Sequence, residues 1–90
     1  MEDHNRAQFQ MHGELNDFLS PAQRGQRFEV SYQGFPSVKD TIESLNVPHP
    51  EVGLILIDGA PVGFDHQLGD GQGVDVYTIA DAPTTEGAPA

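Results

Sequence analysis

Histidine and carboxylate side chains are the groups of this chain that could do chemistry, because they bind metals and transfer protons. The histidines are His4, His12, His49 and His66. None has a second histidine two, three or four residues away, the spacing that local pairs of metal ligands use. Asp70 and Asp75 are interpreted as solvated acids that keep a sheet edge soluble. The sequence therefore predicts solvated histidines, no bound metal and no cofactor.

Motifs for nucleophilic catalysis and phosphate binding are missing as well. Asp65-His66 could orient a base, but no serine lies in a nucleophile-elbow motif, and Ser37 fits better as a helix cap. The glycine-rich segment 69–73 is not followed by the Lys and Ser or Thr of a phosphate-binding loop, nor by a predicted helix. We therefore expect a protein that is not an enzyme and has no catalytic residues.

Length and charge exclude further classes of function. The chain has 90 residues, 14 Asp plus Glu against 4 Lys plus Arg, a formal net charge of -10 and no cysteine. A single domain of this size has little room for a deep substrate cavity, and so acidic a surface repels nucleic acid and anionic membranes. The lack of cysteine excludes disulfides, thiol catalysis and zinc ribbons. With no recognisable membrane span or signal peptide, we expect a cytoplasmic monomer.

Hydrophobic periodicity predicts the elements that position these residues. Alternating apolar residues indicate strands over 6–12 and 28–33, which could pair as an antiparallel hairpin around a short helical turn at 14–19. Ser37 and the apolar spacing after it predict a helix over 38–46. The apolar run 54–57 is expected to be the central strand, covered on both faces.

The rest of the chain completes a small α+β domain. Asp58-Gly59 predicts a type I′ turn into an edge strand that contains Pro61, and Val74 and Val76 begin a last strand that extends toward Ile79. The predicted order is ββαβββ with a mixed sheet and one main helix, most economically a β-grasp. We expect flexible tails at 1–5 and 81–90 around a domain at 6–80, which keeps a net charge of -6.

Several segments, taken in order, resemble the ubiquitin-like superfamily of β-grasp proteins. Within it, the chain is most similar to the small domain N-terminal to Mut-seven C-terminal type RNase domains in bacteria, over residues 6–77. The matching segments are ELNDFL (14–19), PSVKD (36–40), VPH (47–49), EV (51–52), LILIDG (54–59), and Leu68, Asp70-Gly71 and Val74. The resemblance implies a ubiquitin-like fold and an accessory role beside a PIN-like RNase, in cis or in trans. The nuclease part itself is absent, so its activity does not carry over to this chain.

A more distant resemblance is to the ThiS- and MoaD-like sulfur carriers, at Leu68-Gly69-Asp70-Gly71. Gln72 stands where those proteins usually have an acid. Their chemistry needs a flexible tail that ends in Gly-Gly, whereas the last glycine here is Gly87, followed by Ala88-Pro89-Ala90. A sulfur carrier in cofactor biosynthesis is therefore the alternative function, disfavoured by the missing Gly-Gly.

Recognition of a protein partner is the function that these observations leave. Phe35, His49, Val62 and Phe64 are apolar or semi-polar groups in or beside predicted loops, and they are candidate partner contacts. They could equally be plugs of the domain's own core, and that interpretation is the favoured one. We therefore expect a non-enzymatic interaction module whose acidity suits a basic protein surface.

Overall fold

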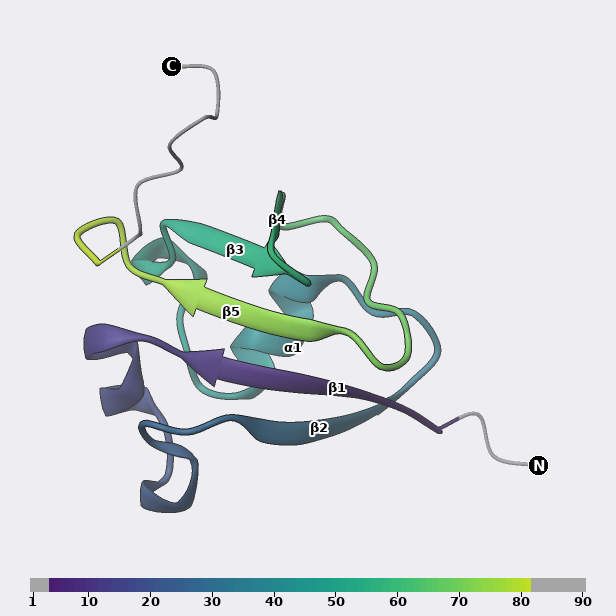
Figure 1. The fold of residues 1–90 in the computed structure, drawn as a ribbon, viewed down its shortest axis with the longest axis horizontal. Helices are drawn as coiled ribbons and strands as arrows, with labels where there is room; N and C mark the ends of the chain where they lie inside the picture. The colour runs from purple at the N-terminus through teal and green to yellow at the C-terminus, as the bar shows by residue number, and fades with distance from the viewer. Residues whose placement is uncertain (1–3, 82–90) are drawn as a thin grey trace.

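Five strands form one mixed sheet in this computed structural model, which describes residues 4–81 (Figure 1). The strands are β1 (His4–Met11), β2 (Phe28–Gln33), β3 (Leu54–Ile57), β4 (Ala60–Val62) and β5 (Gly73–Tyr77). Helix α1 (Val38–Ser44) covers one face of the sheet. Three short 3-10 helices are η1 (Gly13–Phe18), η2 (Pro21–Gln23) and η3 (His49–Glu51). The strand order is β2-β1-β5-β3-β4, with β1 and β5 parallel and the other pairs antiparallel. The predicted ββαβββ order and the β1–β2 hairpin are confirmed.

The prediction that residues 54–57 form the central strand is wrong. β5 lies at the centre of the sheet, because it pairs with β1 on one side and with β3 on the other. Along β3, Ile55 and Ile57 are buried against the core, whereas Leu54 and Leu56 are only half-buried on the opposite face. We call the sheet face opposite α1 the open face. The apolar run thus belongs to a strand covered on one side, and its two leucines give the open face an apolar surface.

The core lies between the sheet and α1. Phe9 and Met11 of β1, Val74 and Val76 of β5, and Ile42 of α1 are almost fully buried there. The ring of Phe9 stacks on that of Phe28 with centroids 6.5 Å apart. The cluster forms because the apolar residues at every second position of the strands all face the helix.

Local turn and cap chemistry ends the elements where the sequence indicates. Ser37 caps α1, since its Oγ accepts a hydrogen bond from the Asp40 N–H at 3.1 Å. The helix ends at Ser44, two residues earlier than predicted, and Asn46 adopts a left-handed φ of 71°. Asp58 and Gly59 have φ values of 51° and 86°, which confirms the type I′ turn and leads into β4 at the sheet edge.

The strands at the two ends of the chain differ slightly from the predicted bounds. β1 begins at His4, two residues before the predicted start. β5 ends at Tyr77, and Ile79 lies beyond it with 81% of its surface exposed. Most of the predicted tails, 1–3 and 82–90, lie outside the described residues. Within residues 4–81, no helix is long and apolar enough to cross a membrane.

Candidate functional site

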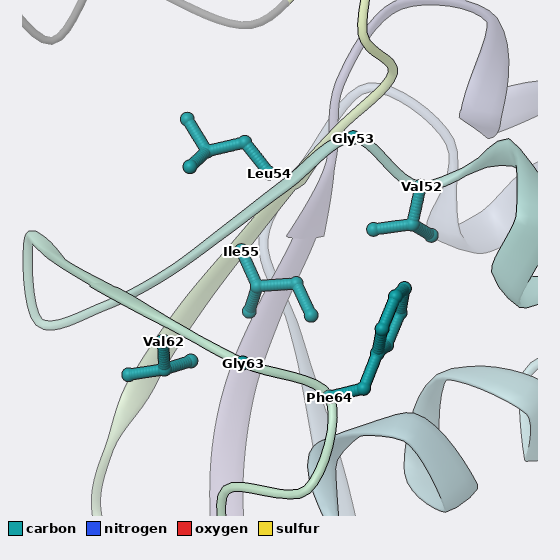
Figure 2. Close-up of a pocket in the computed structure, with 7 residues that line it drawn as sticks. All are labelled: Val52, Gly53, Leu54, Ile55, Val62, Gly63 and Phe64. Atoms are coloured by element: carbon teal, nitrogen blue, oxygen red, sulfur yellow. The ribbon is translucent and has the colours of Figure 1, made fainter. Parts of the chain in front are cut away.

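A groove opens where β3 and β4 stop pairing. The two strands pair only as Ile55↔Val62, Leu56↔Pro61 and Ile57↔Ala60. The chain before Ile55 and the chain after Val62 then separate from each other (Figure 2). The groove has a volume of about 170 Å³. It is lined by Val52, Gly53, Leu54, Ile55, Val62, Gly63 and Phe64. We call this site the β3–β4 groove.

The side chains of the groove are apolar and come from β3, from β4 and from the residues next to these strands. Figure 2 shows Val52, Ile55 and Phe64 pointing into the groove, while Leu54 points away from it, as alternation along a strand requires. Val52 and Ile55 belong to the buried core, and Phe64 packs partly against that core. Since small-molecule pockets usually occupy about 300–1,000 Å³, this groove suits a single apolar side chain.

Three of the four predicted contact residues lie together at this edge of the domain. Val62 and Phe64 line the groove, and the ring of His49 meets that of Phe64 edge-on, with centroids 5.6 Å apart. Phe35 lies elsewhere, between β2 and α1, with 68% of its surface exposed. Val62 and Phe64 also pack against the core, so they act partly as plugs, whereas Phe35 does not. All four remain predicted contacts.

Sequence reasoning missed the other half of the groove. Val52, Gly53 and Ile55 line it together with Val62 and Phe64. A signal was present, because Gly53 precedes the apolar run of β3 and Gly63 follows β4. Gly63 leaves space beside β4, whereas Ile79 fills the space beside Gly53, and only the register of β3 and β4 shows that the two glycines line the same groove.

A hydrogen-bonded pair of side chains borders the groove beside Phe64. Nδ1 of His49 and Oε2 of Glu43 lie 2.5 Å apart and form a hydrogen bond. This bond lowers the pKa of Glu43, and the positive charge of Lys39 lowers it further. The bond therefore stabilises the native state above the ordinary glutamate pKa, and that stabilisation is lost as the pH falls through the lowered value.

The effect on Glu43 can be measured directly by an NMR titration of its side-chain carboxyl carbon. The midpoint is expected below the ordinary glutamate value, and His49→Phe should move it upward. Phenylalanine keeps a ring against Phe64 but has no hydrogen-bond donor. An unchanged midpoint in His49→Phe would show that the bond does not set the pKa of Glu43.

On the open face, His12 and Asp75 are not simply solvated, which corrects the sequence interpretation. Oδ1 of Asp75 accepts hydrogen bonds from Nε2 of His12 and Nη2 of Arg27, each at 2.9 Å. The His12 ring also stacks on Tyr77 with centroids 4.1 Å apart. Because β5 is the central strand, Asp75 has no free edge to protect; it joins β1 and β5 to the chain before β2.

His49 and Asp70 also form hydrogen bonds, in contrast to the solvated side chains that the sequence predicts. His49 is bonded to Glu43, so it too is not merely solvated. Oδ1 of Asp70 accepts a hydrogen bond from the Arg6 N–H at 2.8 Å, which fixes the 69–73 turn beside β1. Across residues 4–81, no three His, Asp or Glu side chains gather in a way that could hold a metal ion.

Comparisons with known proteins place this geometry in a family and a fold. The family model described as Mut7-C ubiquitin matches residues 4–83. Among solved structures, the crystal structure of SAMP1 from Haloferax volcanii is similar, with a TM-score of 0.63 and 14% sequence identity over 88% of this chain and 100% of that chain. At that identity the likeness concerns the fold alone, and it confirms the predicted ubiquitin-like β-grasp. No curated protein matches the sequence.

Proposed function

Because this chain belongs to the Mut7-C ubiquitin family, we propose that it is a non-enzymatic protein-interaction module that docks onto a PIN-like RNase. The match of the family model over residues 4–83 is the observation that carries this proposal. The sequence resemblance connects that family with such nucleases, in cis or in trans. The module supplies a recognition surface, and the nuclease supplies the chemistry and the contact with RNA.

The chemistry of the described residues supports this division of labour. Several ionisable groups hold elements together through hydrogen bonds, such as His12 with Asp75 and His49 with Glu43. The β3–β4 groove is apolar and sized for one side chain. A net negative charge also favours a basic protein surface, chiefly by speeding association.

Direct binding to purified nuclease domains tests the proposal. Titration of this chain into a Mut-seven C-terminal type RNase domain is expected to give saturable 1:1 binding by calorimetry, and affinity should fall as salt screens the charges. An unrelated PIN domain of similar charge serves as the control. Equal binding to both domains, or to neither, would contradict the proposal.

The sulfur-carrier alternative has a separate readout. Incubation with ATP, an E1-like activating enzyme and sulfide as the sulfur donor should leave the intact mass of the chain unchanged. A mass increase that corresponds to an adenylate or a thiocarboxylate at its C-terminus would support the carrier function instead.

A further inference from the structure

We propose that the β3–β4 groove binds an extended, basic segment of a protein partner, which places one apolar side chain between Ile55 and Phe64. This inference rests on the proposed interaction function and assigns it a surface and a partner chemistry. The segment combines an aliphatic residue for the groove with flanking Lys or Arg residues for the acids around it.

The apolar part of the proposal follows from the shape of the groove. Its floor consists of core residues, Val52 and Ile55, which are 9% and 3% exposed. Phe64 and Val62 form the opposite wall and are half-buried, so their remaining surface is open to a ligand. Burying an apolar side chain against these groups removes apolar area from water at about 25 cal/mol per Å².

The edge position explains why side chains must carry the recognition. β4 is the outermost strand, but it has only three residues, and Pro61 at its centre has no N–H to donate. A segment laid beside β4 could therefore form few main-chain hydrogen bonds. Affinity has to come from the groove and from charge.

The charge around the groove selects a basic segment. Glu51 directly precedes Val52, and Asp65 directly follows Phe64. Glu43 is hydrogen-bonded to His49, whose ring packs edge-on against Phe64. All three acids are exposed. Lys39 is the nearby base: its backbone N–H bonds to the Phe64 carbonyl oxygen, and its charge acts on Glu43. Three acids against one base leave a negative rim.

The asymmetry of the whole chain reinforces this rim. No Lys or Arg follows Lys39, whereas eight acids lie between residues 40 and 81. Arg6 of β1 pairs with Glu29 of β2, and Arg27, which directly precedes β2, pairs with Asp75 of the central strand β5. Because β5 and β3 separate β1 from β4, this positive charge is remote from the groove.

Two synthetic peptides of opposite charge test the proposal on the full chain. The basic probe is fluorescein-labelled SKVKLKVKS, and its counterpart is SEVELEVES, which has the same apolar pattern. Fluorescence anisotropy should show saturable binding of the basic peptide only, weakening as salt rises from about 50 to 300 mM. Amide chemical shifts should change mainly at 52–55 and 62–65. Absence of binding, equal binding of both peptides, or shifts confined to β2 or the open face would overturn the inference.

Matched variants at the two sheet edges test the location. Val62→Thr is expected to weaken binding of the basic peptide about tenfold, since a methyl group is exchanged for a hydroxyl in an apolar site. Val30→Thr is the same change at a half-buried core-contacting position on the opposite edge strand, β2, and should alter affinity by less than about twofold. Thermal unfolding of both variants establishes that they fold. Equal loss in both would refute the groove as the site.

A second pair of variants tests the charges. Asp65→Asn should weaken binding of the basic peptide and make that binding less dependent on salt. Asp17 is an exposed acid in η1, and Asp17→Asn should change neither the affinity nor its salt dependence. If an RNase domain binds Val62→Thr as tightly as the unmodified chain, the groove inference fails while the proposed function stands. If no RNase domain binds but the basic peptide does, the proposed function fails and the groove inference stands.

Discussion

The Phe9→Ala substitution is expected to lower the free energy of unfolding by about 3–5 kcal/mol. Phe9 is 0% exposed and lies in β1, between β2 and the central strand β5. Its ring stacks on Phe28, and its backbone is paired with Val74 in the parallel ladder. Truncation removes the largest buried ring of the core and leaves a cavity that strands paired on both sides cannot close.

The size of the domain makes this effect severe. Natural domains are stable by only about 5–15 kcal/mol, and a domain of this size buries comparatively little surface. Phe9→Ala should therefore shift the urea midpoint, followed by circular dichroism, to a small fraction of its original value. Populations that are partly unfolded without denaturant are expected at about 25 °C.

Phe35→Ala is the matched control, because it removes the same ring from an exposed position. Its effect should stay within about 0.5 kcal/mol. If Phe35→Ala cost as much as Phe9→Ala, Phe35 would be a plug of the core and not a candidate contact. The pair thus tests the burial pattern and one of the predicted contact residues together.

The parts of the fold that the sequence predicts correctly depend on local chemistry. The alternation of Phe28, Val30 and Tyr32 predicts a strand with one buried face, and Ser37 and Asp58-Gly59 specify a cap and a turn within a few residues of themselves. Each of these features is complete within one segment, so the pattern of that segment is sufficient.

The errors concern contacts between distant segments. A four-residue apolar run such as 54–57 is compatible both with a strand covered on two faces and with a strand covered on one. Only the pairing of β5 with β1 and β3 shows which strand is central. His12 and Asp75 are 63 residues apart, so no spacing rule could join them. Both features depend on the order of the strands in the sheet, which no single segment of the sequence specifies.

The candidate site was predictable only in part, for the same reason. His49, Val62 and Phe64 stand out as apolar or semi-polar residues at predicted corners, and the structure brings them to one edge. Val52 and Ile55 read as ordinary core residues, and they are core residues. Their second role exists only because pairing of β3 with β4 ends at Ile55 and Val62 and leaves part of that core accessible.

Gly53→Ala is expected to destabilise the domain by about 1–3 kcal/mol through overpacking. A β-carbon at Gly53 would lie 2.5 Å from the backbone N and Cα of Ile79, and backbone atoms cannot move aside as a side chain can. The Gly53 N–H also donates to the Tyr77 carbonyl oxygen at 2.8 Å, which holds the two chain segments together. Either this bond or the path of the chain after β5 has to change, and urea denaturation would measure the cost.

Gly63→Ala is the control on the opposite wall of the groove. The nearest atom to its added β-carbon is Oδ1 of Asp65 at 3.4 Å, the end of a side chain that can rotate, and its φ lies outside the left-handed region. The substitution should be neutral or stabilising by up to about 1 kcal/mol, because alanine restricts the unfolded chain. Val52 and Gly53 both line the groove, so a change in the path of the chain at Gly53 should also displace part of its lining. Gly53→Ala should therefore weaken binding of the basic peptide more than Gly63→Ala does. Equal stability of the two variants would mean that the segment around Ile79 yields freely, and then the close approach at Gly53 does not hold the groove wall in place.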